Sequence, residues 1–190
     1  MNPLDRIIML YVDFETRVQK SISQFFGSTC SACRGVCCKI DYCQETRESL
    51  FLSKLREEYQ PAASYSDETG WQSETGCDLT TGRPPVCYEY LCDEILSAQP
   101  THTHRYAVKV LSQLISHVGK RAYRGKHIVE ICEAEELQRI ALSAFERRLG
   151  ESSAAFHVIE TFYENTFFSV REWGKLTKIV SAPKEVNLKR

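Results

Sequence analysis

The cysteines of this chain are concentrated in about a third of its length. Eight of the nine lie in a stretch that begins at Cys30 and ends at Cys92. Thiolates packed this densely are soft, anionic donors, and they suit Zn²⁺ or an iron–sulfur cluster better than any oxygen-seeking cation. The structure of this stretch therefore depends on whether its sulfurs hold a metal or hold each other.

The rest of the composition favours metal over disulfides. The chain has 190 residues, of which 43% are hydrophobic, so it can bury a substantial core and does not need disulfides to stay folded. The first residues, from Met1 to Arg6, lack the charged and apolar regions of a signal peptide. We therefore expect a cytoplasmic protein with reduced thiols. Clustered cysteines in that compartment are more often metal-binding or catalytic than crosslinked.

Charge and hydropathy argue against two classes of partner. The formal net charge of −1 argues against a large basic surface for nucleic acid. No run of about 18 apolar residues is present, so we expect no membrane span. The sequence contains no glycine-rich phosphate loop, no nucleophile elbow and no radical-enzyme Cys-x₃-Cys-x₂-Cys triplet. It therefore identifies no catalytic residue, and a protein partner stays an open question.

The hydrophobic pattern predicts a mainly α fold, organised as a single domain over residues 1–190. Asn2 and Pro3 are typical of a helix start, as cap and first helical residue. Apolar residues then recur at steps of three and four as far as Phe25, which predicts a long amphipathic helix. Gly27 is the expected end of this helix.

A cysteine-rich, irregular metal-binding segment is predicted over residues 28–93. Within it, an apolar stripe predicts a helix from about Thr46 to Tyr59. Residues 62–76 are rich in Ser, Asp, Glu and Gly, which predicts a surface loop carrying a lone Trp71. A short helix is expected to begin near Val86, after two prolines.

After Pro100 the pattern becomes helical, and we expect a helical half over residues 101–180. Residues 127–131 alternate in hydropathy and predict a short strand, which leaves room for one short hairpin in this half. Gly150 is expected to close one helix, and Ser152 or its neighbour to cap the last one.

Spacing selects seven cysteines as the predicted metal ligands. A structural metal site draws ligands from two chain segments, and a two-residue gap lets one turn present two sulfurs to one ion. Adjacent cysteines diverge in helix or strand geometry, so a Cys-Cys pair indicates either one ligand with a bystander or ligands to two metal ions. The predicted ligands are Cys30, Cys33, Cys37, Cys38, Cys77, Cys87 and Cys92.

Other residues could also bind the metal, but each of them could equally be an ordinary structural or exposed residue. Cys43 lies close in sequence but has no motif partner, and the isolated Cys132 is expected to be an ordinary thiol. His102 and His104 could complete a mixed Cys/His site, although such residues are more often exposed at a helix start. Arg83 lies between the later cysteines and could offset the charge of several thiolates.

Two sequence blocks resemble a known family. The first is Cys30-x-x-Cys33 followed by Cys37-Cys38. The second is Cys77-x-Leu79-x-x-x-Arg83-Pro84-x-x-Cys87. Together they are similar to the zinc- or iron-chelating cysteine-cluster family of the YkgJ type, with its CxxCxxCC pattern. The resemblance covers about residues 28–93.

The resemblance implies metal chelation by cysteine. Some members of that family are fused to, or act beside, protein-modifying enzymes such as flagellin lysine methylases. This chain departs from the family pattern in two ways. It has three residues, not two, between Cys33 and the Cys37-Cys38 pair, and one cysteine fewer before the second block.

The sequence thus predicts a cysteine-cluster metal-binding protein. An iron–sulfur cluster is favoured over zinc, because a Cys-Cys pair among so many thiols suits a site with several metal ions. An electron-transfer or redox-accessory role would follow. Two alternatives are a structural zinc-binding adaptor whose helical half contacts a partner, and an accessory subunit of a protein-modifying enzyme.

Overall fold

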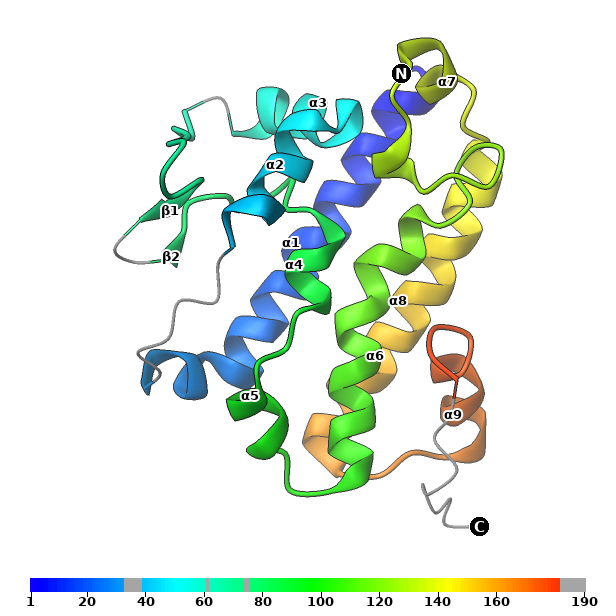
Figure 1. Cartoon of the computed structure of the whole chain (residues 1–190). Coiled ribbons are helices and arrows are strands. Elements are labelled where there is room, and N and C mark those ends of the chain that lie inside the picture. Colours follow the sequence, from blue (N-terminus) through cyan, green and yellow to red (C-terminus); the bar gives the residue numbers. More distant parts are fainter. Residues whose placement is uncertain (33–38, 61, 74–75, 182–190) are drawn as a thin grey trace.

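A computed structural model describes residues 1–32, 39–60, 62–73 and 76–181, except for the side chains of residues 30–32. The described chain is mainly helical, as predicted, with one small two-stranded sheet (Figure 1). None of its helices is long and apolar enough to cross a membrane. The elements are α1 (Pro3–Ala32), α2 (Ile40–Glu48), α3 (Leu50–Tyr59), β1 (Gln72–Ser73), β2 (Gly76–Cys77), α4 (Pro85–Glu89), α5 (Asp93–Ser97), α6 (His102–Gly119), η1 (Ile128–Glu130), α7 (Ala134–Gln138), α8 (Leu142–Asn165) and α9 (Val170–Leu176).

Helix α1 begins where the sequence predicts and ends later. The Asn2 side chain caps it by accepting a hydrogen bond from the Asp5 backbone N–H at 2.8 Å. The predicted end at Gly27 is wrong, because the helix continues to Ala32 and its last turn includes the backbone of Cys30. Nothing lies within 4 Å of the place where a Cβ of Gly27 would be. One glycine inside a helix costs about 1 kcal/mol relative to alanine, and the long apolar stripe of α1 offsets this.

Helix α6 lies at the centre of the hydrophobic core. It packs against α8 along much of its length and against the short helix α4, while α1 packs on α8 (Figure 1). The rings of Phe14 in α1 and Phe156 in α8 meet edge to face, with 5.9 Å between their centroids. One core therefore joins the N-terminal helix to the helical half.

Two predictions for the helical half are wrong in detail. Residues 128–130 form a 3₁₀ turn and not a strand, because the His127 side chain accepts a hydrogen bond from Val129 and Glu130 reaches back to the His127 backbone. Helix α8 runs through Gly150 without a break. Ser152 caps nothing, since it is fully buried within α8 and its hydroxyl donates to the Leu114 carbonyl at 3.2 Å.

The only sheet in the described part of the chain lies in the cysteine-rich segment, and not in the helical half where room for a hairpin was predicted. Strands β1 and β2 pair antiparallel, with Gln72 opposite Cys77. The predicted surface loop is correct for residues 62–69, which form no helix or named strand, but it is wrong at Trp71, because this side chain is only 1% exposed. It packs with Cys43 and Leu79 in a second, small cluster, which we call the Trp71 cluster.

Candidate metal centre

The predicted ligands divide into two groups, and the structure describes one of them. Cys33, Cys37 and Cys38 lie outside the described residues, as does the side chain of Cys30. The three later cysteines are half-buried and come from three consecutive elements. They are Cys77 in β2, Cys87 in α4 and Cys92 at the residue before α5.

The residues that the sequence left open have ordinary structural surroundings. Cys43 is buried in the Trp71 cluster, and Cys132 is exposed, its thiol pointing to the Glu130 carbonyl at 3.4 Å. His104 packs its ring against Phe162, with 4.7 Å between centroids. Its Nδ1 lies 2.8 Å from the hydroxyl of the helix-capping residue before α6. These contacts support a structural role for Cys43 and His104.

The backbone between Cys77 and Cys87 is held by one buried carboxylate, that of Glu15 in α1. Its Oε2 accepts hydrogen bonds from the Thr81 hydroxyl at 2.7 Å and the Gly82 backbone N–H at 2.9 Å. Its Oε1 accepts from the Arg83 backbone N–H at 3.0 Å and the Tyr88 hydroxyl at 2.6 Å. Glu15 is fully buried. We call this arrangement the Glu15 clamp.

The clamp makes a buried charge tolerable. Burial raises the pKa of the Glu15 carboxyl, and the hydrogen bonds from Tyr88, Gly82, Thr81 and Arg83 oppose the rise. Four donors fill the four acceptor positions of a carboxylate. Burial and the nearby Glu15 charge raise the pKa of Tyr88 well above its ordinary value, so its hydroxyl stays protonated and keeps donating.

Arg83 braces the same loop from its other side. Its Nε–H donates to the Leu79 carbonyl at 2.6 Å, and its Nη2 donates to the Cys77 carbonyl at 3.2 Å. The guanidinium therefore joins the two ends of the turn that leads from Cys77 to the prolines. This explains why an arginine stands between these cysteines: it fixes the backbone that carries them.

The start of α2 contacts the part of the chain that carries Cys87 and Cys92. Lys39, the residue after Cys38 in the sequence, places its ammonium 5.5 Å from the centre of the Tyr90 ring, and Tyr42 lies beside the same ring. Tyr90 stands between Cys87 and Cys92 in the sequence. At the other end of the first group, α1 packs against α5, which begins directly after Cys92 (Figure 1).

Two buried donors in the Trp71 cluster lack an acceptor. The indole Nε1–H of Trp71 and the Nε–H of Arg56 make no hydrogen bond within the described residues. The Arg56 guanidinium lies over the Trp71 ring, 5.4 Å from its centre, and Cys77 packs against the same cluster. Unpaired donors beside a cysteine suit an anionic acceptor such as a metal-bound thiolate or a cluster sulfide.

The described cysteines do not make a site by themselves. Within residues 39–60, 62–73 and 76–181, no three Cys, His, Asp or Glu side chains come together as a metal-binding group.

Sequence reasoning missed Glu15, although a signal was present. Glu15 stands four residues after Tyr11 and one after Phe14, on the stripe that was assigned to the core. A charged residue inside an apolar stripe indicates a buried polar contact. The pattern could not identify the partners, because they lie more than 60 residues further along the chain.

No family model, curated protein or solved structure matches this chain. The resemblance to the cysteine-cluster family thus rests on the two sequence blocks alone.

Proposed function

We propose that this chain binds a metal centre through its cysteines, with an iron–sulfur cluster as the favoured centre and an electron-transfer or redox-accessory role. The observation that carries the proposal is the contact of Lys39 with Tyr90. Lys39 follows Cys38 directly in the sequence, and Tyr90 lies between Cys87 and Cys92. A metal centre needs ligands from two such segments.

The Glu15 clamp supports this proposal because it orders the second segment without using its sulfurs. Thr81, Gly82 and Arg83 give their polar groups to Glu15, and the Arg83 side chain is occupied by backbone carbonyls. The loop is therefore held by its backbone, and the thiols of Cys77 and Cys87 stay half-buried at its two ends. Ligands on a rigid backbone bind metal with less loss of conformational entropy.

The unpaired donors of Trp71 and Arg56 support an anionic centre next to the hairpin. Several thiolates around Fe or Zn carry net negative charge, and N–H donors close to the sulfurs stabilise that charge and tune a cluster's potential. When bound, an iron–sulfur cluster would supply one-electron transfer, and zinc would supply a crosslink between the two segments.

Purification without oxygen, followed by visible absorption and analysis for iron, sulfide and zinc, tests the proposal. We expect a brown protein with iron and sulfide. A colourless protein with stoichiometric zinc would favour the structural adaptor, whose partner surface would be the helical half. A protein without any bound metal under these conditions contradicts both.

Single substitutions locate the centre. Cys33→Ser and Cys87→Ser should each lower the metal content, since each removes a predicted ligand. Cys132→Ser is the matched control, because Cys132 is exposed and lies on the helical side. Full metal content in Cys87→Ser would remove the second segment from the proposed site.

A further inference from the structure

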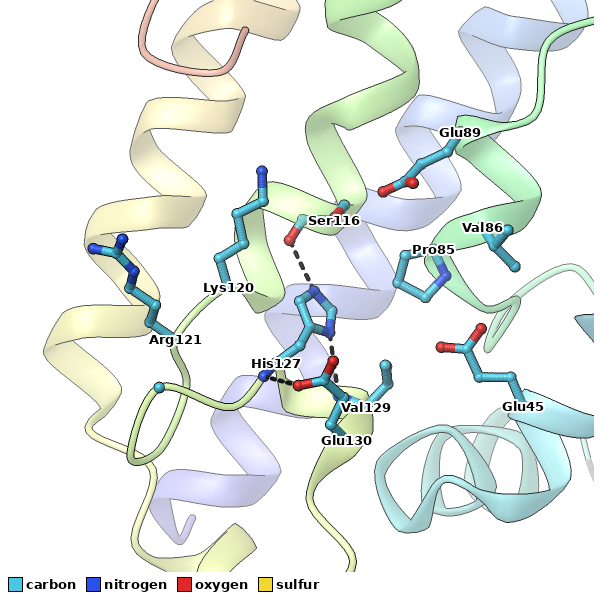
Figure 2. A pocket seen from close by; sticks show the side chains of 11 residues that line it. Glu45, Pro85, Val86, Glu89, Ser116, Lys120, Arg121, His127, Val129 and Glu130 are labelled. Atoms are coloured by element: carbon cyan, nitrogen blue, oxygen red, sulfur yellow. Dashed lines mark hydrogen bonds between the residues drawn. The ribbon is translucent and has the colours of Figure 1, made fainter.

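A second feature of the molecule is a cavity whose lining contains no cysteine. This cavity of about 410 Å³ opens between α2, α4, the end of α6 and the loop before η1 (Figure 2). Pro85, Val86 and Val129 provide apolar lining. The volume falls within the range of small-molecule sites in proteins.

Three carboxylates from three separate elements line this cavity. Glu45 comes from α2, Glu89 from α4 and Glu130 from η1. Glu130 accepts a hydrogen bond from the His127 backbone N–H at 2.7 Å. Glu45 and Glu89 have no cationic partner within the part of the chain that the structure describes. Burial raises the pKa of Glu45, and the nearby charges of Glu89 and Glu130 raise it further. This side of the cavity is acidic because no cation among the described residues pairs with Glu45 or Glu89.

Two cations line the opposite side. Lys120 and Arg121 directly follow α6, and Figure 2 shows Lys120 across the cavity from Glu45 and Glu89, whereas the Arg121 guanidinium points away from these carboxylates. They too lack a carboxylate partner among the described residues. The two charged sides thus face one cavity but do not pair with each other.

His127 stands between the charged sides and contributes no charge of its own. Its Nε2 lies 2.9 Å from the Ser116 carbonyl, to which it donates, and its Nδ1 accepts from the Val129 backbone N–H at 3.4 Å. Both ring nitrogens are therefore occupied in the neutral form. Burial lowers the pKa of His127, which favours the same form.

We propose that this cavity binds a small zwitterion of the amino-acid type, with its ammonium between Glu45 and Glu89 and its carboxylate at Lys120. Its methylene groups would lie on Pro85 and Val86. A ligand with only one charge would satisfy one side of the cavity and be repelled by the other, so the lining selects a molecule that carries both charges. This inference does not depend on the metal proposal.

Three probes of one chain length test the charge requirement. They are 5-aminopentanoate, which carries both charges, pentylamine, which carries only the cation, and pentanoate, which carries only the anion. Calorimetry and NMR titration of the full chain up to about 20 mM should show saturable binding of 5-aminopentanoate and much weaker binding of the other two. Absence of saturable binding for all three overturns the proposal.

Paired substitutions test the two sides. Glu45→Gln with Glu89→Gln should weaken 5-aminopentanoate by at least about tenfold, whereas Glu94→Gln, on the exposed start of α5, should not. Lys120→Ala should also weaken it, with Lys54→Ala as the exposed control on α3. If the double variant fails to fold, Lys120→Ala decides the question, because Lys120 is exposed. Tighter binding of pentylamine by Lys120→Ala, with no loss for 5-aminopentanoate, would identify a site for cations alone and overturn the proposal.

Discussion

The helical half and the hairpin segment, residues 62–83, are stabilised by different kinds of contact. Helix α6 packs against both α4 and α8, and its buried apolar residues belong to the main core. The hairpin segment shares only the Trp71 cluster, in which three residues are buried. Its other fixed points include polar contacts to Glu15, to Arg83 and to Gln60, which accepts hydrogen bonds from Thr80 and Thr81. Thr46 also donates to the Gly82 carbonyl, and Arg47 pairs with Asp67.

The difference determines how each region tolerates change. Apolar burial stabilises in proportion to area and without strict direction, so a large core distributes the effect of one substitution. Hydrogen bonds each contribute only about 1 kcal/mol net, but a buried donor left unpaired costs about 1–3 kcal/mol. The hairpin segment therefore depends on a few groups, and a metal crosslink would add the stability that its small cluster cannot supply.

Under the proposed function, removal of the metal centre should give the largest effect, and this effect should be confined to the hairpin segment. The chain has two tryptophans, one in each region: Trp71 in the hairpin segment and Trp173 beside Tyr106. In a Trp173→Phe variant, stripping the metal with a chelator should shift Trp71 emission to longer wavelength, while far-UV circular dichroism keeps most of its helical signal.

Unchanged Trp71 emission after complete removal of the metal would show that the hairpin segment folds without it. A full loss of helical signal would also contradict the prediction, because the helical half would then depend on the metal as much as the hairpin segment does.

Glu15→Ala should come next, with a loss of about 3 kcal/mol or more in the free energy of unfolding. The substitution removes the Glu15 acceptor from three buried donors and from the part-buried N–H of Arg83. Because these donors fix the loop between Cys77 and Cys87, the metal content should fall as well. Urea denaturation and metal analysis measure the two effects.

Asp13→Ala is the matched control, an exposed carboxylate two residues away in the same helix. It should change neither the stability nor the metal content. Equal effects of both substitutions would mean that the Glu15 clamp does not hold the loop.

The sequence predicted the regular parts of this fold better than the clamp or the Trp71 cluster. The N-terminal cap at Asn2 and the amphipathic helices follow from local preferences and from spacing, and both are confirmed. The continuation of helices through Gly27 and Gly150 was missed, because burial of neighbouring residues outweighs the local cost of one glycine. Trp71 was misplaced because residues distant in sequence cover it. The metal ligands and the metal itself stay predictions.

Gly119→Ala should have a smaller effect, about 1–3 kcal/mol, confined to the helical half. A Cβ at this position would run into the His127 ring and lie 2.8 Å from Cγ2 of Ile128. Thermal unfolding should shift to lower temperature, while the metal content and Trp71 emission stay as in the unaltered chain.

Gly150→Ala, also a glycine-to-alanine substitution, should have the opposite effect on stability. Nothing lies within 4 Å of a Cβ at this site in α8, so alanine should stabilise by about 0.5–1 kcal/mol. If both substitutions changed the melting temperature in the same direction, the close contact of a Cβ at Gly119 with His127 and Ile128 would not determine how that site tolerates alanine.

The pH dependence of His127 should be the smallest effect. Burial lowers its pKa in the folded chain, whereas the unfolded chain keeps the ordinary value near 6.5. Stability from this group is therefore present above about pH 6.5. It falls as the pH drops below that value, and the loss is complete once the pH lies below the pKa of the folded chain.

His127→Gln should remove this part of the acid sensitivity, although it also lowers the stability at pH 8. Melting temperatures of the two chains at pH 8 and pH 5 measure the difference. His102→Gln, exposed at the start of α6, should keep the full acid sensitivity. A steeper acid loss in His127→Gln than in the unaltered chain would contradict the prediction.

The clamp also sets an order of events during synthesis. Glu15 leaves the ribosome 66 residues before Thr81 and 73 residues before Tyr88. At about 5–20 residues per second, its carboxylate waits roughly 4–15 s for its last donor. The buried face of α1 cannot close completely until then, by which time the whole first cysteine group has been made. Under the proposed function, this delay is the interval in which a metal or a preformed cluster can reach the first thiols before the second group arrives to enclose it.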